Sequence, residues 1–193
     1  MLYAVGRFLA MIVLMPLFFV KIIGKKNAML AGGSVVICKH KSNWDPIVLG
    51  FSVKKRPVCY MAKEELFNSK FAACVLRHLY VIPVARGKSD IKAIKTAISK
   101  LNSGSVLGIF PEGTRSKELL EFEPGAAMLA LKSDVPVVPV YIKGNYKLFH
   151  RIKVFIDPPI YLKEFVGEKV NSESVKKATA LLQAKILEMS KRI

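Results

Sequence analysis

Short apolar runs that alternate with stretches of helical periodicity are the feature that most limits what this chain can fold into. The runs are SVVIC (34–38), PVCYM (57–61), YVIPV (80–84), SVLGIF (105–110) and VVPVYI (137–142). They are rich in Val and Ile and apolar on both faces, which is typical of strands in a sheet that is covered on both sides. A further run, RIKVFI (151–156), precedes Asp-Pro-Pro and predicts a late strand.

Amphipathic stretches separate these runs. Within 90–102, Ile91, Ile94, Ile98 and Leu101 recur at helical spacing, and Ser89 or Asp90 is the expected N-cap. Shorter helices are predicted over 71–79 and 125–132, and a long one over 172–191. Alternation of strands and helices indicates right-handed crossovers, and therefore a single α/β domain with a mostly parallel central sheet covered by helices.

The first 30 residues differ from the rest. The stretch FLAMIVLMPLFFVKII (8–23) has Lys21 as its only charged residue, is borderline for the ~20 residues that a bilayer span needs, and contains a helix-kinking Pro16. We expect residues 1–30 to be a membrane-associating helical segment and 31–193 to be the globular domain. A kinked helix in one leaflet, with its basic flank on anionic headgroups, is the main prediction. A single span with a cytoplasmic C-terminal domain, and a helix packed on the domain's own core, are alternatives.

The charge of the chain restricts its partners. There are 31 Lys and Arg against 14 Asp and Glu, a formal net charge of +17, and the mean hydropathy is +0.32. Such a surplus favours polyanions: nucleic acid, an anionic bilayer, a phosphorylated metabolite or an acidic carrier protein. Because the basic residues are spread out and no zinc-ligand, basic-heptad or RNA-binding pattern occurs, we expect a membrane surface rather than nucleic acid. Three cysteines without paired spacing indicate a reducing compartment.

Polar segments follow three of the apolar runs. His40 and Asp45 lie in KHKSNWD (39–45), Arg86 follows the third run, and FPEGTRS (110–116) ends the fourth. In a parallel sheet these segments emerge at one edge, where ligand sites of open α/β sheets gather. The sequence therefore predicts that a His–Asp pair and two arginines lie close together.

His40 and Asp45 have the composition of a catalytic base and its partner. A carboxylate on one imidazole nitrogen fixes the tautomer and leaves the other nitrogen as a general base. Since no serine accompanies the pair, the nucleophile would be a substrate hydroxyl that attacks a thioester. A loop histidine beside an Asp that caps the next helix is the alternative. Cys38 as a covalent nucleophile is a rival mechanism, although a buried strand cysteine is the simpler interpretation.

The segment FPEGTRS is typical of a phosphate-binding turn. Backbone N–H groups around Gly113, together with Thr114 and Arg115, can hold a phosphate, and Arg86 is a second candidate ligand. Glu112 could orient Arg115 or a substrate hydroxyl. A surface turn with an Arg–Glu ion pair is the alternative.

These blocks, in this order and spacing, resemble the glycerolipid acyltransferase family with its HX4D motif. The likeness covers roughly 34–160 and is strongest to the bacterial 1-acyl-sn-glycerol-3-phosphate acyltransferases. It implies that His40 is the general base and Asp45 its partner, and that Arg86, Glu112, Gly113, Thr114 and Arg115 bind the glycerol-phosphate end of the acceptor. One departure is Glu123, which stands where many relatives have a lysine.

The resemblance also implies a reaction and its partners. An acyl group would pass from acyl-carrier protein or acyl-CoA to the sn-2 hydroxyl of lysophosphatidate, giving phosphatidate with no metal and no bound cofactor. Another lysophospholipid or glycerol 3-phosphate as acceptor, and a non-catalytic basic module that only binds membranes, remain as alternatives. The expected location is the cytoplasmic face of the cell membrane.

Overall fold

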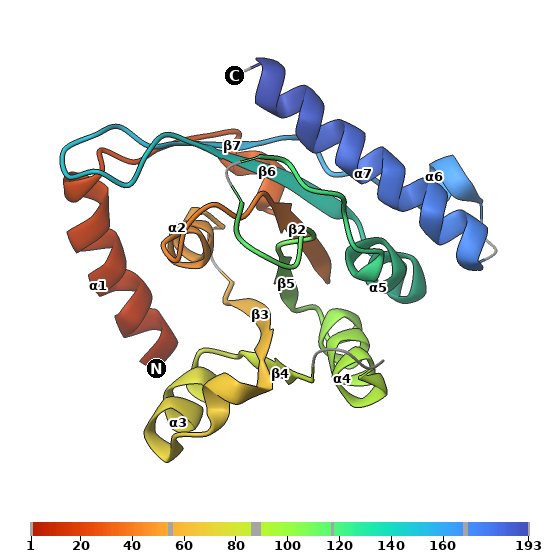
Figure 1. The fold of residues 1–193 in the computed structure, drawn as a ribbon, viewed down its shortest axis with the longest axis horizontal. Coiled ribbons are helices and arrows are strands. Elements are labelled where there is room, and N and C mark those ends of the chain that lie inside the picture. The colour runs from red at the N-terminus through yellow and green to blue at the C-terminus, as the bar shows by residue number, and fades with distance from the viewer. Residues whose placement is uncertain (1, 54–55, 86–89, 117, 168–169, 193) are drawn as a thin grey trace.

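The computed structural model describes residues 2–53, 56–85, 90–116, 118–167 and 170–192, which fold around a seven-stranded sheet (Figure 1). The sheet order is β1-β7-β6-β2-β5-β3-β4. The strands are β1 (Lys21–Ile23), β2 (Ser34–Cys38), β3 (Val58–Lys63), β4 (Ile82–Val84), β5 (Val106–Ile109), β6 (Val137–Lys143) and β7 (Lys153–Ile156). Neighbouring strands are parallel except β6 and β7, which are antiparallel. The predicted mostly parallel α/β sheet is confirmed.

Helices cover both faces of this sheet, with α1 and α2 on one side and α4, α5 and α7 on the other (Figure 1). The helices are α1 (Leu2–Leu17), α2 (Asp45–Ser52), α3 (Lys70–His78), α4 (Ile91–Asn102), α5 (Gly125–Ser133), α6 (Lys163–Val166) and α7 (Ser172–Arg192), with 3-10 turns η1 (Lys25–Ala28) and η2 (Glu64–Phe67). The expected N-cap of α4 is Asp90, whose carboxylate accepts a hydrogen bond from the Ala93 N–H at 2.9 Å. The alternative cap, Ser89, lies outside the described residues.

The central strand β2 explains why the sheet is covered twice. All five of its residues are buried. Because successive side chains alternate between faces, Val35 and Ile37 join the core beneath α4, α5 and α7, whereas Val36 and Cys38 join the core beneath α1 and α2. Each face of β2 is thus closed off from water, and only the residues after its carboxyl end can reach a substrate.

The N-terminal segment differs from its prediction. The predicted helix over 8–23 is wrong in its second half, because α1 ends at Leu17 and residues 21–23 form strand β1, which pairs in parallel with β7. Phe18 and Val20, which lie between α1 and β1, are buried in the domain core. Their burial sets the course of the chain from the helix into the strand. Among the described residues, no helix combines the length and the apolar character needed to cross a bilayer.

Helix α1 nevertheless has two apolar faces. Leu14 is buried against the domain, as the core-packing alternative expects. The opposite stripe is exposed to about half of its side-chain area: Val5, Phe8, Leu9, Ile12 and Val13 are between 49% and 57% accessible. A helix that is buried on one side and apolar on the other leaves an apolar surface that no described part of the chain covers.

Candidate active site

Two loops meet at the carboxyl edge of the sheet because β2 and β5 are neighbours. The strands run parallel in the register Ser34↔Val106 to Ile37↔Ile109, so the segments after Cys38 and Ile109 leave the sheet side by side. The Ser116 N–H donates to the His40 carbonyl oxygen at 3.0 Å, and Arg115 Nη1 donates to Asn43 Oδ1 at 2.5 Å. The two motifs predicted to share an edge are therefore joined directly. Arg86 lies outside the described residues.

His40 and Asp45 form the expected pair. His40 Nδ1 and Asp45 Oδ2 are 3.0 Å apart, with side-chain exposures of 18% and 1%. The imidazole can therefore be reached by a substrate, whereas the carboxylate is sealed inside. A buried carboxylate on Nδ1 favours the tautomer in which Nε2 is the unprotonated nitrogen, the arrangement of a general base.

Asp45 is held by four hydrogen bonds. Besides His40, the backbone N–H groups of Lys41 and Ser42 donate to Oδ2, both at 2.6 Å, and the Tyr146 hydroxyl donates to Oδ1 at 2.6 Å. Burial alone raises the pKa of Asp45, but the hydrogen bonds from His40, Tyr146, Ser42 and Lys41 outweigh it and the pKa is lowered. The carboxylate therefore stays ionised.

The predicted helix cap at Asp45 is displaced by one residue. Trp44 is the N-cap of α2, Asp45 is its first helical residue, and Pro46 follows within the first turn. The Asp45 carboxylate folds back onto the loop 40–42 instead of capping its own helix. The Asp45 carboxylate accepts hydrogen bonds from loop N–H groups and, within the described residues, makes no capping bond to its own helix. The alternative of an ordinary capping Asp is therefore wrong.

Aromatic rings fix the orientation of the imidazole. The His40 ring stacks on Phe110 at a centroid distance of 4.2 Å, and Phe110 lies parallel to Tyr60 at 6.2 Å. The Tyr60 hydroxyl donates to the Pro46 carbonyl oxygen at 2.6 Å. Room for this stack comes from Gly108 in β5, where a Cβ would lie 2.5 Å from the Tyr60 ring. Phe110, the residue before the turn at 111–115, thus also supports the His40 imidazole.

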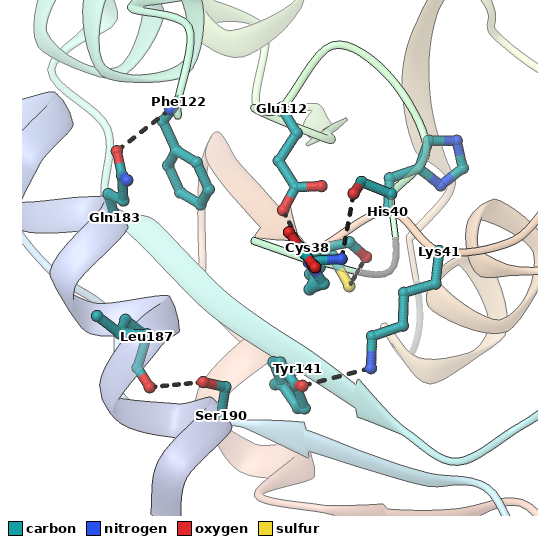
Figure 2. A network of polar contacts seen from close by, with 12 residues as sticks. Cys38, His40, Lys41, Glu112, Phe122, Tyr141, Gln183, Leu187 and Ser190 are labelled. Atoms are coloured by element: carbon teal, nitrogen blue, oxygen red, sulfur yellow. Dashed lines mark hydrogen bonds and ion pairs between the residues drawn. The ribbon is translucent and has the colours of Figure 1, made fainter. Parts of the chain in front are cut away.

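Glu112 pairs with Lys39 and not with the predicted Arg115. Its Oε1 is 3.3 Å from Lys39 Nζ, and the two side chains are 0% and 4% exposed. The expectation that Glu112 pairs with Arg115, on the surface or within the site, is wrong because the carboxylate is buried and points toward the end of β2 at Cys38 (Figure 2). Glu112 Oε2 is buried and has no hydrogen-bond partner among the described residues. The ion pair joins the turn that contains Glu112 to the residue before His40.

Gly113, Thr114 and Arg115 form the exposed part of the turn. Gly113 has a φ of +66°, a conformation that residues with a Cβ rarely adopt. Glu123 lies beside it, since a Cβ on Gly113 would be 3.8 Å from Glu123 Cγ. Arg115 reaches toward the His40 loop through Asn43, so a phosphate bound here would lie next to the base.

Two further side chains of the His40 segment, Lys41 and Cys38, have surroundings of their own. Lys41 Nζ donates to the Tyr141 hydroxyl at 3.3 Å and lies over its ring, on the side of the sheet that α7 covers (Figure 2). Cys38 is fully buried in the core, and burial, with the charge of Asp45, raises the pKa of its thiol well above the usual value. A thiol that resists ionisation is a poor nucleophile, which argues against the covalent mechanism.

The sequence interpretation missed Tyr146, Lys39 and Phe110. Tyr146 is 101 residues from Asp45, and Lys39 is 73 residues from Glu112. No spacing pattern reports pairs of this kind, because they depend on how β2, β5 and the β6–β7 connection meet. Only Phe110 had a local signal, since it directly precedes the turn on a strand next to β2.

Known proteins resemble this chain in sequence and in fold. The sequence model of the Acyltransferase family matches residues 19–143. A 1-acyl-sn-glycerol-3-phosphate acyltransferase of Bacillus subtilis is 31% identical over 90% of this chain and 89% of its own length. One of Streptococcus pneumoniae is 27% identical over 77% of this chain and 57% of its own length. The crystal structure of a 1-acyl-sn-glycerophosphate acyltransferase from Thermotoga maritima superposes with a TM-score of 0.66 at 27% identity, covering 89% of this chain and 72% of that one.

Proposed function

This chain belongs to the Acyltransferase family, and on that premise we propose that it transfers a fatty acyl group to the sn-2 hydroxyl of 1-acyl-sn-glycerol 3-phosphate. The His40–Asp45 pair at 3.0 Å is the observation that carries the proposal. It supplies a base without a nucleophile of its own, and the exposed Gly113–Arg115 turn beside it suits a phosphorylated acceptor. The names of the relatives support the same acceptor.

The proposed reaction is a direct transfer. His40 Nε2 takes the proton of the acceptor hydroxyl as its oxygen attacks the carbonyl carbon of a thioester. The carbon–oxygen bond forms, the carbon–sulfur bond breaks, and the departing thiolate takes the proton from His40. Asp45 stabilises the positive charge that His40 carries between these two steps. Backbone N–H groups of the turn that begins at Glu112 are candidates for stabilising the oxyanion.

We assign the phosphate end of the acceptor to Gly113, Thr114 and Arg115. Arg115 offers a guanidinium to the phosphate while its contact with Asn43 keeps it near the base. Arg86 remains a proposed second ligand on the strength of the family resemblance. Glu112 is proposed to act through Lys39, by holding the turn, because its side chain is 0% exposed. A substrate hydroxyl would reach Glu112 Oε2 only after that side chain moved.

We further propose that an anionic membrane surface presents the acceptor. The exposed stripe of α1 is continued by Phe19 and by the tip of the β6–β7 connection, where Leu148 is 60% and Phe149 is 70% exposed. The Phe19 and Phe149 rings lie 6.5 Å apart, so the two segments form one apolar surface. Lys147 and Arg151 flank the tip, which suits anionic headgroups. We also propose that the protein binds this surface from the cytoplasmic side. The proposed acyl donor is acyl-carrier protein or acyl-CoA.

The test of the reaction is a product analysis. Purified protein is incubated with lysophosphatidate, another lysophospholipid or glycerol 3-phosphate, each with acyl-CoA and with acyl-carrier protein, and products are identified by mass spectrometry. Phosphatidate formed from lysophosphatidate is the expected result, and the donor pair that supports it identifies the thioester. Transfer to glycerol 3-phosphate alone would replace the proposed acceptor. No transfer with any pair would refute the enzymatic proposal for these substrates.

Two variants test the mechanism. His40→Ala is expected to lower transfer by several orders of magnitude while binding to vesicles is unchanged. If the protein were only a basic membrane-binding module, His40→Ala would keep its function. Cys38→Ala is expected to keep kcat within a few-fold of wild type, because the thiol is buried in the core. An isolable acyl-enzyme on Cys38, or full activity of His40→Ala, would contradict direct transfer.

The membrane proposal has its own test. Sedimentation with phosphatidylglycerol vesicles, compared with phosphatidylcholine vesicles, measures binding to an anionic surface. The paired change Phe8→Ser and Leu9→Ser on the exposed stripe is expected to reduce binding. Phe165→Ser on α6 is the matched control, because Phe165 is similarly exposed at 60% but lies outside that surface. Equal loss in both variants, or no loss in the stripe variant, would contradict the assignment.

A further inference from the structure

The second oxygen of the Asp45 carboxylate is held by a residue that lies far away in the sequence. Oδ2 accepts three hydrogen bonds, from His40 and from the Lys41 and Ser42 N–H groups. Among the described residues, the donor to Oδ1 is the Tyr146 hydroxyl, at 2.6 Å. Rotation of this carboxylate about its Cβ–Cγ bond would displace both oxygens. A short bond at Oδ1 therefore opposes that rotation together with the bonds at Oδ2, and helps to fix the plane in which His40 Nδ1 must lie.

Tyr146 is itself held by the N-terminal part of the chain. The Phe18 and Tyr146 rings form a T-shaped pair at a centroid distance of 5.6 Å and an angle of 87°, and the Phe18 and Trp44 ring centroids are 6.0 Å apart. Phe18 is buried, with 3% of its surface exposed. Phe18 therefore fills the space between Tyr146 and Trp44, the N-cap of α2.

Backbone hydrogen bonds fix the connection that carries Tyr146. The Phe149 N–H donates to the Leu17 carbonyl oxygen at 2.8 Å, and the Ile152 N–H donates to the Phe18 carbonyl oxygen at 2.9 Å. The Lys21 N–H donates in turn to the Ile152 carbonyl oxygen at 2.8 Å. The segment between α1 and β1 and the β6–β7 connection are thus one hydrogen-bonded unit, and Tyr146 extends from this unit to Asp45.

We propose that Tyr146 is a positioning residue that fixes the His40–Asp45 pair, and that Phe18 holds Tyr146 in place. This inference rests on the proposed function, because it assigns Tyr146 a role in the same acyl transfer. Tyr146 touches neither the imidazole nor the reacting atoms; it acts through Asp45. Burial, the charge of Asp45 and the hydrogen bond itself raise the pKa of Tyr146, so the hydroxyl remains a donor throughout the working pH range.

The test begins with Tyr146→Phe, which removes one hydroxyl and keeps the ring. We expect kcat to fall about tenfold, the effect of losing one hydrogen bond to a charged group, with KM for the acceptor nearly unchanged. Tyr3→Phe is the matched control: its hydroxyl also makes a part-buried hydrogen bond, which it accepts from the Val58 N–H at 2.9 Å, but its partner belongs to β3 and not to the pair. Both variants are assayed well below their melting temperatures. Equal losses in the two variants would reduce Tyr146 to a structural residue and overturn the proposal.

A titration provides a readout that does not depend on turnover. The carboxyl carbon of Asp45, labelled with ¹³C, is followed by NMR in wild type and in Tyr146→Phe. His40, Lys41, Cys38 and Tyr146 are the titratable groups that interact with or surround this carboxylate. Loss of the Tyr146 donor is expected to raise the pKa of Asp45, and Tyr3→Phe is expected to leave it in place. An unchanged Asp45 titration overturns the proposal even if kcat falls.

Phe18→Leu tests the support for Tyr146. We expect a smaller fall in kcat in the same direction, and little further fall when Phe18→Leu is added to Tyr146→Phe, because both act on one hydrogen bond. Additive losses would show that Phe18 acts elsewhere. If wild-type protein transfers no acyl group to any acceptor, the proposed function fails, whereas the Asp45 titration still decides whether Tyr146 controls the carboxylate.

Discussion

Replacing Asp45 by asparagine separates the charge of the proposed catalytic pair from its geometry. The amide oxygen can take the place of Oδ2 and keep the hydrogen bonds from His40 and from the Lys41 and Ser42 N–H groups. The amide NH₂ then faces Tyr146, whose hydroxyl can accept instead of donate. The reverse orientation would set the NH₂ against three donors. We therefore expect Asp45→Asn to fold with the side chain in the first orientation.

The size of the effect follows from the distance within the pair. When His40 holds the substrate proton, its positive charge lies 3.0 Å from Oδ2. At an effective dielectric constant of about 20, unit charges at this separation attract by roughly 5 kcal/mol. Asparagine keeps a hydrogen bond but removes this attraction. We expect kcat to fall on the order of 10³–10⁴-fold, in line with the loss of a buried carboxylate from other His–Asp pairs.

Release of the free thiol from acyl-CoA, at saturating lysophosphatidate, measures this fall in kcat. Thermal unfolding of the same samples verifies that the variant is folded at the assay temperature. A matched control is Asp157→Asn, since Asp157 is also a buried carboxylate in ion pairs but contacts Lys185 and Arg192 of α7. Activity of Asp45→Asn within tenfold of wild type would refute the assignment of Asp45 as the charge partner of His40.

Three other outcomes are expected. Arg115→Ala should raise KM for the phosphorylated acceptor about tenfold or more with a smaller change in kcat, measured by steady-state kinetics; an unchanged KM would remove Arg115 from the phosphate site. Gly108→Ala should lower the free energy of unfolding by about 1–3 kcal/mol in urea titrations, because its Cβ would lie 2.5 Å from the Tyr60 ring; full stability would contradict that packing. Folding lowers the pKa of Asp45. The ionised carboxylate therefore contributes to stability above about pH 4, and this contribution is lost as pH falls through the folded-state pKa. The difference in unfolding free energy between wild type and Asp45→Asn should shrink over that acidic range.

The strands of the core could be read from local pattern. The runs at 34–38, 105–110 and 137–142 correspond to β2, β5 and β6, with ends that differ by at most one residue. Each is apolar on both faces, and that pattern has few solutions other than a strand covered twice. The parallel arrangement then followed from the helices between them, and it brought the loops after β2 and β5 to one edge.

The N-terminal segment shows where local pattern fails. Its apolar run predicted a helix to residue 23, but β1 forms because Lys21, Ile22 and Ile23 find partners in Lys153, Val154 and Phe155. A three-residue strand has too few residues to leave a pattern, and its stability depends on a partner more than 130 residues away. The predicted helix was extended to residue 23 because the run 8–23 is apolar throughout. Composition does not reveal that Phe18 and Val20 are buried in the domain core, where the chain leaves the helix.

Local sequence was enough to predict the parallel sheet, the contact of His40 with Asp45 and the turn at 110–116, because each depends on residues close together in the chain or on strand order. The groups that hold these residues follow from tertiary packing instead. Asp45 accepts a hydrogen bond from the Tyr146 hydroxyl, and Glu112 forms a buried ion pair with Lys39 instead of an exposed one with Arg115. Buried polar groups must find partners wherever the packed chain supplies them, and in this protein the partners come from segments 73 and 101 residues away.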